Sequence, residues 1–101
     1  MIDLVDLDEM WGKNPELNKC LSSIETVLIT NDTTDYEMFW VEEKQALVFR
    51  HISGKAVMRI YGEGNVETDY INPFNNELYR IRGPFKESDL NSFFTMYGER
   101  R

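Results

Sequence analysis

The stretch ALVFRHISGKAVMRIYGEGNVETDYI, residues 46–71, decides the fold. It holds three runs rich in β-branched, aromatic and other apolar residues, separated by SGK at 53–55 and GEGN at 62–65. Runs of this kind favour strands, and short links that contain glycine favour tight turns. Because parallel neighbours need a connection of about a dozen residues or more, we expect these strands to be antiparallel.

The strand pattern continues on both sides of this stretch. The turn-forming residues NDTTD and NPFNN separate further apolar runs from it. ETVLIT at 25–30 is β-branched and apolar, so it is interpreted as the first strand. The sheet is therefore expected to have about five or six strands, at residues 25–30, 36–42, 46–52, 55–61, 66–71 and 77–82.

Helical periodicity appears near the beginning of the chain. A first short helix is indicated by Leu7, Met10 and Trp11, which share a face, and Gly12 is expected to end it. A second helix over residues 15–23 follows. Asn14 is its expected N-cap, Pro15 occupies its first position, and its apolar residues Leu17, Cys20, Leu21 and Ile24 recur with helical spacing.

A third helix is expected at the end of the chain. Leu90, Phe93, Phe94 and Tyr97 again recur with helical spacing, and Ser88 is a good N-cap residue. Helices at both ends of a run of hairpin-linked strands predict one α+β domain, residues 1–101. We expect the N-terminal and C-terminal helices to cover one face of the antiparallel sheet.

Composition narrows the class of protein. The chain has 101 residues, of which 42% are hydrophobic and 29% charged, as in ordinary globular domains. Its single cysteine, Cys20, excludes an internal disulfide. The longest apolar runs have four residues, too short for a signal peptide or a membrane span. A cytoplasmic location is the expectation.

The negative charge is concentrated in the first half of the sequence. The net charge is −7, and residues 1–45 alone carry eleven acidic and three basic residues, or −8. An acidic surface argues against direct binding of nucleic acid or of anionic membranes, which both require basic residues. It favours a basic protein partner, such as a nuclease, a toxin or a nucleic-acid enzyme.

No motif indicates catalysis, a cofactor or a metal. His51 is the only histidine, and no CxxC or HxxxH spacing surrounds it or Cys20. GEGN at 62–65 lacks the rest of a phosphate-binding loop and is interpreted as a hairpin turn. The chain is therefore expected not to be an enzyme.

The candidate partner-binding residues lie in NDTTDYEMFWVEEKQ, residues 31–45. Its strand is expected to be central or next to the edge, with solvated acidic ends. An uncovered sheet face is expected to display aromatic side chains, namely Trp40, Tyr61, Tyr70 and Tyr79. Carboxylates would attract a basic partner and aromatic groups would anchor it. The predicted binding residues are Asp32, Asp35, Tyr36, Glu37, Trp40, Glu42 and Glu43.

In size, acidity and order of elements, the chain resembles bacterial toxin-immunity proteins and phage-encoded counter-defence proteins, some of which mimic DNA. This resemblance implies a non-enzymatic inhibitor of a basic partner, and it assigns no residue a role. Two alternatives remain. One is a homo-oligomeric assembly subunit whose open sheet face forms a homodimer, and the other is a ligand-binding domain or enzyme with a pocket near His51.

Overall fold

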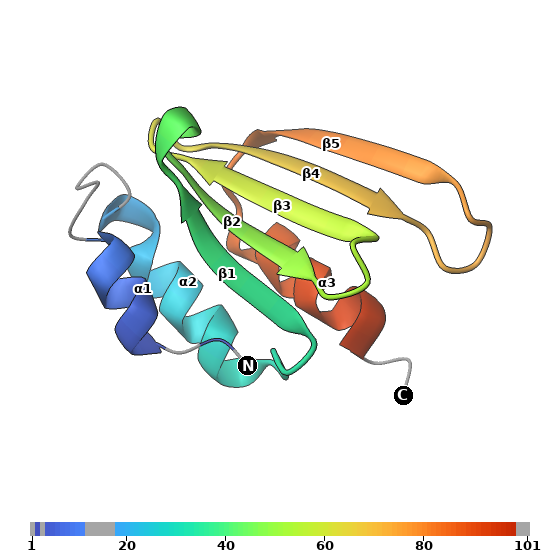
Figure 1. The fold of residues 1–101 in the computed structure, drawn as a ribbon, viewed down its shortest axis with the longest axis horizontal. Coiled ribbons are helices and arrows are strands. Elements are labelled where there is room, and N and C mark those ends of the chain that lie inside the picture. Colours follow the sequence, from blue (N-terminus) through green and yellow to red (C-terminus); the bar gives the residue numbers. More distant parts are fainter. Residues whose placement is uncertain (1, 3, 12–17, 99–101) are drawn as a thin grey trace.

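The computed structural model describes residue 2 and residues 4–11 and 18–98 (Figure 1). The elements follow the chain in a simple order. They are α1 (Leu4–Trp11), α2 (Asn18–Thr30), β1 (Tyr36–Val41), the 3-10 helix η2 (Glu42–Lys44), β2 (Ala46–His51), β3 (Ala56–Tyr61), β4 (Asn65–Ile71), β5 (Leu78–Pro84) and α3 (Glu87–Gly98).

The five strands form one antiparallel sheet in the order β1-β2-β3-β4-β5. The helices α1, α2 and α3 lie on the same side of it, and none of the described helices covers the opposite face, which we call the open face (Figure 1). The predicted α+β fold, with its antiparallel sheet and terminal helices, is confirmed.

The hydrophobic core lies between the sheet and the helices. Alternate residues of the strands point toward α2 and α3, and both helices contribute large apolar side chains. The core residues that are at most 2% exposed include Leu7, Ile24, Val27, Tyr36, Leu47, Phe49, Met58, Ile60, Leu90, Phe93 and Phe94.

The strand predicted for residues 25–30 is wrong, because these residues complete α2. Ile24, Val27 and Leu28 are buried at helical spacing, whereas Ile29 is 68% exposed. A strand would have placed Val27 and Leu28 on opposite faces. The segment is therefore helical despite its β-branched composition, because its apolar residues continue the helical spacing of Cys20 and Leu21.

This correction changes the position of β1. Without a strand at residues 25–30, β1 has only β2 as a neighbour among the described strands, so it is an edge strand rather than a central or next-to-edge strand.

The predicted helix starts have different outcomes. Asn14 and Pro15, the expected start of the second helix, lie outside the described residues. At the third helix the expected cap Ser88 is wrong, because the helix begins at Glu87. The backbone N–H groups of Asp89 and Leu90 donate to the Lys86 carbonyl at 3.1 and 3.3 Å, so the first turn starts before Ser88.

Over the described ranges 4–11 and 18–98, no helix is both long and apolar enough to cross a membrane.

Tyr36 fixes β1 to α3. Its side chain is 2% exposed, and its hydroxyl donates to the carbonyl of Phe93 at 3.0 Å. Its ring also makes an edge contact with Phe94, with 4.9 Å between centroids. Tyr36 is therefore a core residue, and its predicted role in partner binding is wrong because the helices cover its face of the sheet.

We expect Tyr36→Phe to lower the free energy of unfolding by about 1 kcal/mol, because it keeps the ring but removes the buried hydrogen bond that the hydroxyl shares between the Phe93 and Phe94 carbonyls. Urea unfolding measures this change. Tyr79→Phe is the control, since the Tyr79 hydroxyl accepts from the exposed Asn75 at 2.9 Å. Its effect should stay below about 0.5 kcal/mol. Equal effects of the two substitutions would contradict the role of Tyr36.

Candidate functional site

Carboxylates lie beyond both ends of β1. Asp32 and Asp35 precede the strand, while Glu42 and Glu43 follow it in η2. Six residues of strand at about 3.3 Å each separate the two groups by roughly 20 Å. Four of the five predicted acidic residues therefore form two groups, one at each end of an edge strand, and the fifth, Glu37, lies within the strand.

The backbone of β1 has groups that point away from the sheet. The N–H of Ile52 donates to the Asp35 carbonyl at 2.9 Å, which makes these two residues a hydrogen-bonded pair. Antiparallel pairs alternate, so residues 37, 39 and 41 also bond toward β2. The N–H and C=O groups of Met38 and Trp40 therefore point outward along the edge.

Trp40 lies on the helix-covered face, because it pairs with the core residue Leu47, and it is half-buried against the core. Its indole N–H donates to Glu42 Oε2 at 2.8 Å. Of the four aromatic residues predicted on the open face, only Tyr61 lies there. Tyr70 packs against the core, and Tyr79 pairs with it on the same face. Trp40 is thus not the exposed anchor that was predicted.

Glu37 projects onto the open face and is already engaged. Its carboxylate accepts from Nη2 and Nε of Arg50 at 2.6 and 3.0 Å. The Arg50 guanidinium also lies 5.7 Å from the centre of the Phe39 ring. Asp32 has local contacts as well, since it accepts from the backbone N–H of Thr34 at 3.0 Å.

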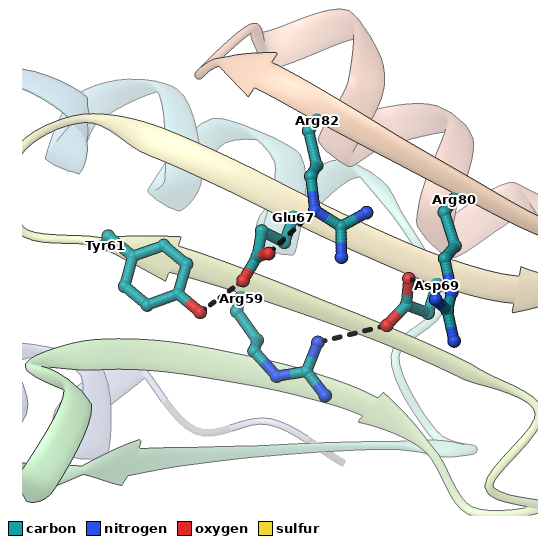
Figure 2. A network of polar contacts seen from close by, with 6 residues as sticks. All are labelled: Arg59, Tyr61, Glu67, Asp69, Arg80 and Arg82. Atoms are coloured by element: carbon teal, nitrogen blue, oxygen red, sulfur yellow. Dashed lines mark hydrogen bonds and ion pairs between the residues drawn. The ribbon is translucent and has the colours of Figure 1, made fainter.

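A polar network that the sequence interpretation missed covers the β3–β5 part of the open face (Figure 2). Glu67 accepts from Tyr61 and from Arg82, the latter at 2.8 Å. Asp69 lies between Arg59 at 3.3 Å and Arg80 at 3.7 Å. The sequence did contain a signal for this network. Residues 59 and 61, 67 and 69, and 80 and 82 are each two positions apart in a strand, so both side chains of each pair lie on the same face of the sheet.

The network shifts the pKa values of two of its members. The hydrogen bond from Tyr61 is the main cause that lowers the pKa of Glu67 below its ordinary 4.5, and Arg82 acts in the same direction. The same hydrogen bond is the main cause that raises the pKa of Tyr61 above 10.0. The carboxylate and the phenol thus both keep their neutral-pH states over a wider pH range.

The β1–β3 part of the open face is more apolar. An open depression of about 220 Å³ lies there. Val48, which is 3% exposed, lies in this depression, and cationic side chains lie beside its apolar residues. The lining residues are Phe39, Val41, Lys44, Val48, Arg50, Val57 and Arg59.

His51 sits at the edge of the core. Its ring packs edge-on against Tyr36 with 5.0 Å between centroids, and its Nδ1 lies 2.7 Å from the Ser53 hydroxyl. Among the residues whose side chains are described, no three His, Cys, Asp or Glu groups lie close enough together to hold a metal ion.

Comparison of the chain with protein-family models, with curated proteins and with solved structures gives no match.

We expect Tyr61→Phe to raise the pKa of Glu67 toward its ordinary 4.5, because it removes the main hydrogen bond to the carboxylate. A carboxyl-carbon NMR titration measures this shift. Since the folded pKa lies below the unfolded one, Glu67 stabilises the fold above pH 4.5, and this contribution is lost as pH falls through the folded pKa.

Tyr61→Phe should therefore also reduce the loss of stability in acid. Tyr70→Phe, on the other face of β4, is the control and should leave the Glu67 titration unchanged. An unshifted Glu67 titration in Tyr61→Phe would contradict the proposed cause.

Proposed function

We propose that this chain is a non-enzymatic acidic binding protein that neutralises a basic protein partner in the cytoplasm. The observation that supports it best is the edge strand β1 with carboxylates beyond both of its ends. The partner would be a protein with a basic segment, such as a nuclease, a toxin or a nucleic-acid enzyme.

The edge position of β1 supports docking by strand addition. An extended peptide can add a strand to a sheet edge by hydrogen bonds to outward backbone groups. The outward groups of Met38 and Trp40 supply donors and acceptors for such a strand. Asp35 at one end and Glu42 and Glu43 at the other would meet cationic side chains of the added segment.

The carboxylates would also select the partner. Charged residues at an edge strand discourage non-specific pairing with other strands. Asp32, Asp35, Glu42 and Glu43 would repel acidic segments and attract a segment rich in lysine or arginine, which also speeds association. Partner choice would then depend on charge, and affinity on the backbone of β1.

The spacing of the carboxylates favours strand addition over nucleic-acid mimicry. Phosphates follow one another at about 3.4 Å of helix axis in each strand of a duplex. The acidic groups of β1 are instead two clusters roughly 20 Å apart, and Glu37 between them is paired with Arg50.

The test is the double reversal Glu42→Lys/Glu43→Lys. The control is Glu63→Lys/Glu77→Lys, which changes the net charge equally at two exposed turn residues outside β1 and η2. Wild type and both variants are immobilised and exposed to the same nuclease-treated lysate, and retained proteins are eluted with a salt gradient. We expect a basic protein that is retained by wild type and control, with affinity for the reversal weakened at least about tenfold.

A second readout is amide hydrogen exchange in the complex, where the amides of Met38 and Trp40 should become protected. The proposal fails if all three columns retain the same proteins at the same salt, or if the captured partner leaves these two amides unprotected.

A further inference from the structure

One row of side chains crosses all five strands of the open face. Successive pairings of neighbouring strands place its members side by side, in the order Glu37, Arg50, Val57, Asp69 and Arg80. From β1 to β5 their charges are negative, positive, neutral, negative and positive. Read from β5 to β1, the charges are positive, negative, neutral, positive and negative. Each charged position of the row therefore has a residue of opposite charge at the equivalent position on the other side of Val57.

We propose that the open face binds a second copy of the chain. The two copies are related by a two-fold axis that lies between their sheets, parallel to β3 and next to Val57. A rotation about this axis places β1 over β5 of the partner subunit. Glu37 then faces Arg80 of the partner subunit, and Arg50 faces Asp69 of the partner subunit. The same contacts occur twice, as a two-fold interface requires.

The dimensions of stacked sheets allow these contacts. Packed sheets lie about 10 Å apart with strand directions within about 30° of each other. Arginine, glutamate and aspartate side chains from both sheets reach across part of this gap. The internal pairs Glu37–Arg50 and Asp69–Arg80, at 2.6 and 3.7 Å, would join into alternating networks across the interface.

Of the next two rows toward η2, the row through Tyr61 adds apolar contacts under the same rotation, whereas the row through Arg59 adds mainly polar ones and sets Val48 against Glu67 of the partner subunit. Val41 faces Pro84 of the partner subunit, and Tyr61 meets its own equivalent at the axis. Phe39 faces Arg82 of the partner subunit, a pairing that suits a cation–π contact. Arg59 also meets its equivalent at the axis, and its ion pair with Asp69 at 3.3 Å offsets that repulsion.

The distribution of charge makes this face the most favourable approach for a second copy. Two chains of charge −7 repel each other. The open face, however, carries every arginine that the structure describes, and its carboxylates nearly balance them. These residues are Arg50, Arg59, Arg80 and Arg82 with Glu37, Glu67 and Asp69. The contact also leaves the outward edge of β1 accessible, so it is independent of the binding proposed there.

The test is the charge swap Glu37→Arg/Arg50→Glu, followed by sedimentation equilibrium. The swap keeps the net charge and an Arg–Glu pair within the protomer, but it makes the row symmetric, so that like charges face each other across the interface. The control swap, Lys86→Glu/Glu87→Lys, changes two exposed residues at the start of α3, on the other side of the sheet.

Wild type and control should show a species of twice the 11.9 kDa protomer mass. The swap should weaken dimerisation at least about tenfold for each pair made repulsive, with an unchanged circular dichroism spectrum. If the charge swap alters the fold, the substitution Val57→Lys replaces it in the experiment. This substitution places like charges at the axis and should also weaken dimerisation.

A wild type that stays monomeric up to about 1 mM would overturn the proposal. The proposal would also be overturned if the protein dimerises and neither the correctly folded charge-swap variant nor Val57→Lys weakens the dimer. The face would then be a solvated surface of internal ion pairs. Neither result depends on a captured partner, so failure here is distinguishable from failure of the binding proposed at β1.

Discussion

The packing of α1, α2 and α3 against one face of a five-stranded sheet is the constraint on which the other features depend (Figure 1). Because residues 18–30 form α2 and not a further strand, β1 is left at the edge. Because α2 and α3 supply the apolar cover on one side, the other side must satisfy its polar groups by itself. The arginine–carboxylate network on the open face does so for most of these groups, although Asp69 Oδ1 accepts no hydrogen bond and has Arg80 only at 3.7 Å.

The sequence was sufficient for the antiparallel order of β1–β5 and for the helix at the end of the chain, since hairpin links and helical spacing are local signals. It was insufficient where two local signals competed. In residues 25–30, β-branched composition suggested a strand, while the spacing of Ile24, Val27 and Leu28 suggested a helix, and packing against the sheet favours the helix.

The candidate site was predicted in part, and the errors have one cause. Alternation within a strand shows which residues share a face, but the register between strands decides which of those faces joins the core. Trp40 pairs with Leu47 and so belongs to the covered face. Tyr36 contacts α3 through a carbonyl 57 residues away in the sequence, a contact that no local pattern reveals. Counting net charge separately for each half of the sequence likewise did not reveal that the four described arginines gather on one face.

The most direct test of this account is amide hydrogen exchange along β1 in the free protein, read by NMR. We expect exchange rates to alternate along the strand, because the amides of Phe39 and Val41 bond toward β2 and should exchange slowly. Met38 and Trp40 point outward and should exchange rapidly. Slow exchange at all four amides, together with strand-like chemical shifts at residues 25–30, would show that β1 has a second neighbour and would contradict the account.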